Sequence, residues 1–300
     1  MKPTATATVT EPRALDTLRD LIALSKPRIT FMVLVTTATG LWLAPTPLAL
    51  PRAIVTLIGV GLVIAAANAF NMYLERDVDA LMRRTRNRPL PAGRMQPEVA
   101  IAFGLFCAIF ALPVVRAAAN PLTALLSLAS LVLYVCAYTP LKRYSALALP
   151  VGAIPGAIPP LLGWTASTGH LDAPGVALFA LMFVWQLPHS IAISIFRGEE
   201  YARAGLKVTA VVSGIDGARK QIVFWSIVQF AVSLAVRWSG VGGRFYEGAA
   251  FALGAVLLAL CGFGLRPMTD DQTRRWARWF FFYSIIYLPV LFAALVLGRS

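Results

Sequence analysis

The sequence is poor in charged residues and in cysteine. Of its 300 residues only 14% are charged, whereas 58% are hydrophobic. A soluble domain typically carries about 25% charged residues, so an ordinary soluble domain is excluded. The three cysteines lie inside apolar runs without paired spacing, which argues against a disulfide framework or a zinc site. These cysteines, which we interpret as small packing residues, are Cys107, Cys136 and Cys261.

Acidic residues are also scarce, at 14 against 27 Lys and Arg, which gives a formal net charge of +13. The basic residues lie between apolar runs rather than on one soluble module, so we exclude nucleic acid as a partner. The first stretch has no apolar core of the kind that a secretory signal needs. We expect residues 1–22 to form a mobile cytoplasmic tail and residues 23–300 to form a single transmembrane domain.

Nine long apolar segments follow the tail, separated by short polar stretches. Such runs are typical of transmembrane helices, whereas barrel strands would alternate between apolar and polar residues. The predicted fold class is therefore an all-α polytopic membrane protein with nine transmembrane helices. The fifth segment is rich in Pro and Gly, and we expect it to kink or break. The segments are residues 29–48, 53–73, 99–116, 122–138, 149–164, 175–195, 222–236, 248–265 and 280–297.

The basic residues predict the orientation of the chain. The tail and the loops after the second, fourth, sixth and eighth segments hold 22 of the 27 Lys and Arg. Lys and Arg concentrate in cytoplasmic loops of membrane proteins. We expect a cytoplasmic amino terminus and, with nine spans, a carboxyl terminus on the outer side of a bacterial inner membrane.

The acids that flank the predicted spans form two clusters. Glu75, Asp77 and Asp79 follow the second segment, and Glu199 and Glu200 follow the sixth. Acids close to a membrane span are costly and therefore informative. The offset of four segments indicates two parallel four-helix pseudo-repeats plus one further helix, with a site between the halves.

The spacing within the first cluster predicts a metal site. Asn71, Glu75 and Asp79 stand at i, i+4 and i+8, so a helix that continues this far presents all three on one face. Together with Glu199 and Glu200 they would form a ring of oxygen ligands suited to Mg²⁺.

Basic residues surround these acids, and Arg and Lys are the side chains that bind phosphate oxygens. The pattern therefore favours a site for a metal and a diphosphate. The alternative, that these are solvated loop residues that set the orientation, stays open and is stronger for the arginines than for the acids. The basic residues are Arg83, Arg84, Arg86, Arg88, Lys142, Arg143 and Arg197.

Two runs at this place resemble a known family. Residues 71–79, Asn-Met-Tyr-Leu-Glu-Arg-Asp-Val-Asp, resemble the N-x-x-x-D-x-x-x-D motif of the UbiA-type intramembrane prenyltransferases. Residues 84–93 resemble their R-T-x-x-R-P-L-P-x-G run. Further stretches resemble the haem O synthase branch of that family, and the resemblance covers most of the chain beyond the tail. Those stretches are residues 25–29, 138–143, 156–164, 185–190 and 196–205.

The resemblance implies the transfer of a farnesyl group from farnesyl diphosphate to a vinyl group of haem b, with addition of water and release of diphosphate. It implies contact with membrane lipid, and candidate partners are haem A synthase and cytochrome oxidase assembly factors. It assigns Mg²⁺ and catalysis to Asn71, Glu75, Asp79 and Glu200, with Glu199 as a further metal ligand. It assigns substrate binding to Arg84, Arg88, Lys142, Arg143, His189 and Arg197.

The chain departs from the family pattern in four places. Glu75 and Glu200 stand where the family usually has Asp, which moves each carboxylate one methylene further from the backbone. Met72 replaces an Asp found in many other members, which is compatible with the haem branch. After Gly205 the chain lacks the usual P-M-L-P-V run and instead places Lys207 near the expected diphosphate.

The two histidines receive different interpretations. His189 lies in the sixth segment and is a candidate to ligate the haem iron or to orient a substrate, and the alternative is a hydrogen-bonded packing residue. His170 lies in an outer loop, opposite the acids, and receives no role.

Two other functions remain under consideration. One keeps the chemistry and changes the acceptor to an aromatic quinone precursor or a chlorin. The other is a transporter with parallel repeats, which predicts ionisable residues deep in the bilayer rather than at its cytoplasmic rim.

Overall fold

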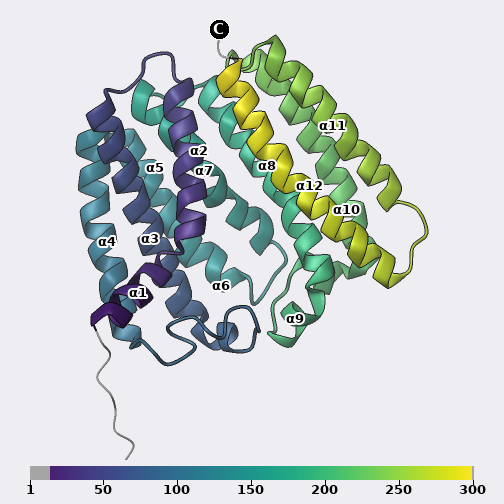
Figure 1. The fold of residues 1–300 in the computed structure, drawn as a ribbon, viewed down its shortest axis with the longest axis horizontal. Coiled ribbons are helices and arrows are strands. Elements are labelled where there is room, and N and C mark those ends of the chain that lie inside the picture. The colour runs from purple at the N-terminus through teal and green to yellow at the C-terminus, as the bar shows by residue number, and fades with distance from the viewer. Residues whose placement is uncertain (1–13, 299–300) are drawn as a thin grey trace, which may run out of the picture.

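The computed structural model describes residues 14–298, and all regular structure in that range is helical (Figure 1). The helices are α1 (Ala14–Leu24), α2 (Pro27–Leu43), α3 (Leu50–Ala80), α4 (Pro97–Ala118), α5 (Pro121–Val132), the π-helix η1 (Leu133–Tyr138), α6 (Thr139–Leu141), α7 (Ala148–Thr168), α8 (Ala173–Phe196), α9 (Gly198–Arg203), α10 (Thr209–Ala235), the 3₁₀-helix η2 (Val236–Ser239), α11 (Arg244–Gly264) and α12 (Asp270–Leu297).

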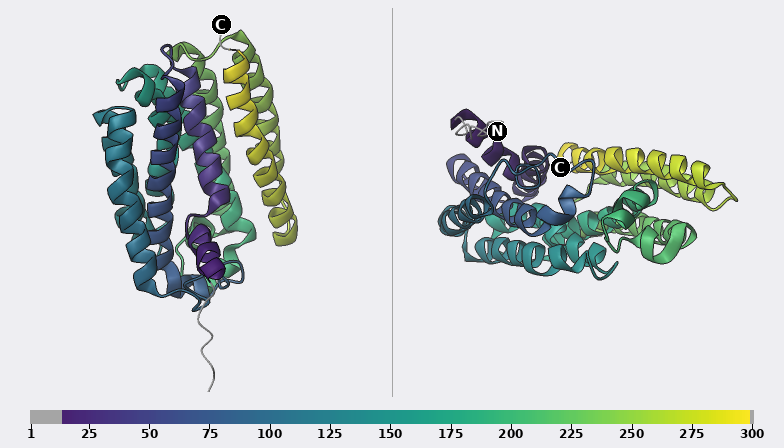
Figure 2. Two further views of the ribbon diagram at one scale, coloured as in Figure 1. Left: turned by 60° about the vertical axis from the view of Figure 1, so that its left-hand side comes forward. Right: turned by 90° about the horizontal axis from the view of Figure 1, so that it is seen from below.

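The long helices form a bundle in two groups. Figure 1 shows α2 to α5 and α7 on one side and α8, α10, α11 and α12 on the other, and Figure 2 shows the same groups from two further directions. Helix α7 packs against α2 and against α8, and so joins the groups. The carboxyl ends of α3 and α8 lie at the same end of the bundle, where α1 and α9 also lie. Both acidic clusters are therefore at one end.

Each of the nine predicted segments lies on a helix of the structure: α2, α3, α4, α5 with η1, α7, α8, α10, α11 and α12. In the described part of the chain, seven helices are long and apolar enough to cross a membrane. The number is eight if α1 and α2, which meet at a bend of 49°, count as one broken span. The prediction of a polytopic all-α membrane protein is thus confirmed.

The fifth segment was expected to kink or break, and the structure shows that it does not break. It runs as one helix from Ala148 to Thr168 although Pro155, Pro159 and Pro160 lie inside it. Pro159 has no N–H to donate to the carbonyl of Pro155, and the Ser130 hydroxyl of α5 donates to that carbonyl instead, at 3.3 Å. A neighbouring helix therefore replaces part of the missing helical bonding.

The predicted tail of residues 1–22 is only partly described, because residues 1–13 lie outside the described range. Residues 14–22 belong to α1, which contacts α3 and α4 at one end of the bundle (Figure 1). The Asp20 carboxylate pairs with Arg94 at 3.0 Å, and Leu24 is fully buried in a cluster that includes Met72. Helix α1 thus closes this end of the first group of helices.

Glycines allow α2 and α7 to touch. A Cβ built at Gly163 would lie 1.9 Å from the carbonyl oxygen of Thr37, and one built at Gly40 would lie 2.0 Å from that of Pro160. Small residues commonly permit such close approach of membrane helices.

We expect Gly163→Ala to lower the free energy of unfolding by about 1–3 kcal/mol, because the new methyl group must push the α2 backbone away. Thermal unfolding of the purified protein in detergent measures this as a lower Tm. Gly248→Ala in α11 is the matched control, since a Cβ there meets no atom within 4 Å. Equal Tm values for the two variants would contradict the close crossing.

Candidate active site

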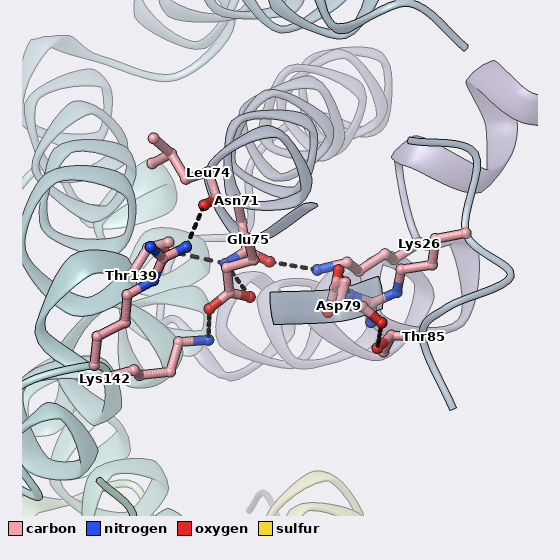
Figure 3. Close-up of polar contacts among 10 residues, drawn as sticks. Lys26, Asn71, Leu74, Glu75, Asp79, Thr85, Thr139 and Lys142 are labelled. Carbon is pink, nitrogen blue, oxygen red and sulfur yellow. Dashed lines mark hydrogen bonds and ion pairs between the residues drawn. The ribbon is translucent and has the colours of Figure 1, made fainter. Parts of the chain in front are cut away.

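The end of α3 carries three polar side chains on one face. Because α3 continues to Ala80, the spacing of Asn71, Glu75 and Asp79 places them one above another, as the sequence predicts. All three are buried, with Asn71 and Asp79 only 1% exposed. Figure 3 shows them converging on a small space between α3, α6 and the start of α2.

The Asn71 side chain connects three elements. Its Nδ2 donates to Glu75 Oε2 at 2.9 Å and to Thr139 Oγ1 at 3.1 Å, and its Oδ1 accepts from Lys26 Nζ at 2.8 Å (Figure 3). Lys26 is the residue between α1 and α2, where its φ of 49° places a non-glycine residue in the left-handed region. Such backbone strain persists where the surrounding structure fixes it.

The two buried carboxylates of α3, Glu75 and Asp79, each pair with a cation. Lys142, just after α6, pairs with Glu75 Oε1, and Arg88 pairs with Asp79 Oδ2. The buried hydroxyl of Thr85 donates to the main-chain carbonyl of Asp79 at 2.9 Å, which secures the turn after α3. Each of the three polar side chains on this face therefore has one Lys or Arg partner.

These residues line a cavity of about 330 Å³, which we call the α3 cavity. Five cationic and two acidic side chains line it, so it carries an excess of positive charge. Burial, and then the nearby Arg88, lower the pKa of Lys26 to about 7. The excess of basic over acidic side chains in this cavity favours a bound polyanion. The charged residues that line the cavity are Lys26, Glu75, Asp79, Arg84, Arg88, Lys142 and Lys207.

Aromatic rings form the wall opposite α3. Tyr134 and Tyr138 lie in the π-helix η1, an irregularity that is frequent at functional sites. The Lys142 ammonium lies 4.6 Å from the centre of the Tyr138 ring. The amide of Lys207 donates to the carbonyl of Lys142 at 3.0 Å, so the chain after α9 closes over the cavity.

The second acidic cluster lies in α9, a separate short helix after α8. Glu199 pairs with Arg274 of α12, and Glu200 Oε2 lies 3.4 Å from Arg197. Glu200 Oε1 is buried without a hydrogen-bond partner among the described residues. A buried carboxylate oxygen without a partner is costly, and Glu200 Oε1 is free to accept a hydrogen bond or to contact an ion.

Glu199 and Glu200 line a neighbouring cavity of about 600 Å³, which we call the α9 cavity. It shares Arg84, Ile193 and Tyr201 with the α3 cavity, so the two spaces adjoin. Within residues 14–298 no three His, Cys, Asp or Glu side chains are close enough to form a ready metal cluster. The structure thus brings Asn71, Glu75 and Asp79 together and places the α9 acids one cavity away.

The α3 face nevertheless suits a hard divalent cation. Asn71, Glu75 and Asp79 offer oxygen donors on one rigid helix, and Mg²⁺ is commonly bound by one or two carboxylates with phosphate oxygens completing its shell. The cations that now hold these oxygens are flexible side chains that can turn to phosphate.

The remaining predicted site residues lie in different places. Arg84 lines both cavities and Arg197 lines only the α9 cavity. Arg143 points away from both and donates to the carbonyl of Leu74 at 2.9 Å.

His189 lines neither cavity. Its Nδ1 lies 2.7 Å from the Ser284 hydroxyl, and its ring packs between Trp185 and Phe281, with ring centres 4.7 and 4.9 Å away. His170 is exposed, and it lies beyond α7 at the far end of the bundle from α9.

Sequence reasoning gave no role to Lys26, Thr139 or Tyr138. Lys26 belongs to a quoted run, residues 25–29, yet its contact with Asn71 spans 45 residues of sequence and no local pattern reveals it. Thr139 and Tyr138 adjoin the predicted Lys142. Tyr138 lines the cavity, and Thr139 accepts a hydrogen bond from Asn71.

Comparison with known proteins identifies relatives along almost the whole chain. The model of the UbiA prenyltransferase family matches residues 33–286. The protoheme IX farnesyltransferase of Anaeromyxobacter dehalogenans is 49% identical over 290 residues, which cover 97% of each chain. That of Myxococcus xanthus is 47% identical over 280 residues, covering 93% of this chain and 94% of the relative.

Solved structures share the fold at low sequence identity. A digeranylgeranylglyceryl phosphate synthase superposes with a TM-score of 0.80 at 14% identity and covers 95% of this chain. A UbiA homologue from Archaeoglobus fulgidus, bound to DMAPP and Mg²⁺, superposes with a TM-score of 0.62 at 18% identity and covers 90% of this chain.

Proposed function

This chain belongs to the UbiA prenyltransferase family, and on that premise we propose that its α3 cavity binds the diphosphate head of farnesyl diphosphate. The protein is a multi-pass membrane prenyltransferase with the activity of the protoheme IX farnesyltransferases, which forms haem O from haem b. The observation that supports the placement is the buried excess of Lys and Arg beside two α3 carboxylates.

The cations of the α3 cavity fit a diphosphate. Lys26, Arg88 and Lys142 reach into one space and already hold oxygens of Asn71, Asp79 and Glu75. Charge-assisted bonds from Arg and Lys to phosphate are strong, and low-dielectric surroundings strengthen them further. We propose that these side chains exchange part of their bonding to the protein for bonding to phosphate.

Mg²⁺ is the proposed metal, held by Asn71, Glu75 and Asp79. Glu199 and Glu200 line the adjoining α9 cavity. From there they would contact the bound diphosphate and its metal. When bound, Mg²⁺ supplies positive charge that makes diphosphate a better leaving group. The metal would replace Lys26, Lys142 and Arg88 as the partner of the three α3 side chains.

The reaction breaks a C–O bond and forms a C–C bond. The bond between farnesyl C1 and the diphosphate oxygen breaks, and its electron pair leaves with diphosphate. The vinyl group of haem b bonds to C1, water adds to the remaining vinyl carbon, and a proton is lost. Lys142 and Arg88 stabilise the charge that develops on the diphosphate, a large contribution to catalysis in many enzymes. Tyr134 and Tyr138 cover the cavity and restrict water from the allylic cation.

We propose nine spans for the membrane domain: the seven long apolar helices, α2 and the proline-rich α7. Two halves of four long helices each, α2 to α5 and then α7, α8, α10 and α11, followed by α12, would place the acid-bearing ends of α3 and α8 on the cytoplasmic side of a bacterial inner membrane. Because haem O keeps a membrane-soluble tail, haem A synthase or an oxidase assembly factor is the expected partner.

Product analysis tests this function. Purified protein incubated with haem b, farnesyl diphosphate and Mg²⁺ should yield extracted haem with the mass of haem O. Parallel incubations with an aromatic quinone precursor or a chlorin should yield no prenylated product. Prenylation of either alternative acceptor in place of haem b would contradict the assignment.

A further inference from the structure

The α9 cavity has an unusual concentration of arginine. It lies at the same end of the bundle as the α3 cavity, between the end of α8, the short α9 and the first turns of α12 (Figure 1). Its volume of about 600 Å³ is within the range of about 300–1,000 Å³ typical of small-molecule sites. Five arginines and two glutamates line it: Arg84, Arg197, Arg203, Arg274, Arg278, Glu199 and Glu200.

Much of this positive charge is not matched within the described chain. Only Arg197 and Arg274 form ion pairs there, with Glu200 and Glu199. The remaining three arginines form none in residues 14–298, and Arg274 Nε is buried without a hydrogen-bond partner. The cavity therefore has the capacity to bind more than one carboxylate.

The inner wall of the same cavity is apolar and aromatic. Phe196, Phe281 and Phe282 line it together with Ile193. The Arg278 guanidinium lies 6.0 Å from the centre of the Phe196 ring, so a cation and an aromatic face are presented together. A flat, apolar ligand with negative charge at one edge matches this arrangement.

We propose that the α9 cavity binds the porphyrin acceptor, with Arg274 and Arg278 holding its propionate carboxylates. The inference rests on the proposed function, which supplies haem b as the acceptor. Haem b has both propionates at one edge and its vinyl groups on the other half of the ring. Arg presents paired N–H donors that match a carboxylate in a bidentate manner.

In this orientation the vinyl half of the porphyrin faces the adjoining α3 cavity. Both cavities share Arg84, Ile193 and Tyr201, so a porphyrin anchored by its propionates at α12 extends its vinyl half towards the diphosphate site. The propionates remain at the polar rim while the ring lies along Phe281 and Phe282. Charge at one end thus selects which edge of haem faces the farnesyl group.

Arg278→Gln tests the proposal, because Arg278 forms no ion pair within the described residues and its replacement leaves no acid without a partner. The probes are haem b and its dimethyl ester, which lacks both negative charges. We expect wild-type protein to bind haem b at least about tenfold more tightly than the ester, measured by absorbance titration in neutral-lipid nanodiscs. Arg278→Gln should weaken haem b binding by about tenfold and leave ester binding unchanged.

Arg275→Gln is the matched control. It removes the same charge from the same helix, but Arg275 is exposed, pairs with Asp271 at 2.8 Å and lies outside the α9 cavity. It should bind both porphyrins as the wild type does. Binding of a non-reactive farnesyl diphosphate analogue should be the same in all three proteins.

The outcomes separate this inference from the function on which it rests. Equal binding of haem b and ester by wild type, or haem b binding unaffected by Arg278→Gln, overturns the propionate site while haem O synthesis stands. A loss of anionic-lipid binding in Arg278→Gln, with haem b binding intact, overturns it in favour of a lipid headgroup. Wild-type protein that binds neither porphyrin overturns the proposed acceptor and this inference with it.

Discussion

Glu75→Gln should reduce kcat for farnesyl transfer by about 100-fold to 1,000-fold while the protein still inserts into the membrane. Glu75 is 8% exposed, pairs with Lys142 and accepts from Asn71, so it is the central oxygen donor of the α3 face. The neutral amide keeps the size and shape of the side chain but removes the charge that a metal needs. It also leaves the Lys142 ammonium without its partner.

Glu98→Gln provides the control for that substitution. Glu98 is an exposed acid in the first turn of α4, with no ion pair in the described part of the chain. We expect wild-type kcat from this variant. If the purified Glu75→Gln enzyme turned over at the wild-type rate, this would contradict a catalytic role of the α3 carboxylates.

Lys142→Gln should lower kcat/KM for farnesyl diphosphate by about 100-fold. Lys142 is half-buried between Glu75 and the Tyr138 ring, and its replacement removes a phosphate-binding cation and leaves a carboxylate without its ion-pair partner. Steady-state kinetics at varied farnesyl diphosphate measure the effect. Saturation with haem b should not restore the rate.

Lys220→Gln is the comparison, because Lys220 is exposed on α10 and lines neither cavity. It should retain wild-type kinetics.

The sequence alone ranks Lys142 and Arg143 equally as substrate-binding residues, whereas the structure turns Arg143 towards the Leu74 carbonyl. A larger defect in Arg143→Gln than in Lys142→Gln would contradict the placement of the diphosphate.

The helices and the α3 face could be predicted from the sequence because both depend on local periodicity. Apolar run length predicts the helices, and the spacing of Asn71, Glu75 and Asp79 fixes their common face once α3 continues to Ala80. The unbroken α7 could not be predicted, since the Ser130 hydroxyl that replaces a missing helical bond comes from another helix. Proline content alone indicates a break.

The partners of the site residues could not be predicted from the sequence. Lys26 meets Asn71 across 45 residues, and Arg274 meets Glu199 across 75 residues. Both pairings depend on how helices distant in the sequence pack. The sequence also predicts one ring of ligands in which Glu199 and Glu200 join Asn71, Glu75 and Asp79. In the structure α9 begins as a new helix and carries Glu199 and Glu200 to the adjoining cavity.

We propose that the α3 face and its cations hold the diphosphate together with a divalent metal. Calorimetric titration with a non-reactive farnesyl diphosphate analogue, with Mg²⁺ and with a chelator, measures it in wild type and in Asp79→Asn. We expect Mg²⁺ to tighten binding to the wild-type protein at least about tenfold and to have little effect on Asp79→Asn. Equal affinity with and without Mg²⁺ in the wild-type protein, or full Mg²⁺ dependence in Asp79→Asn, would contradict it.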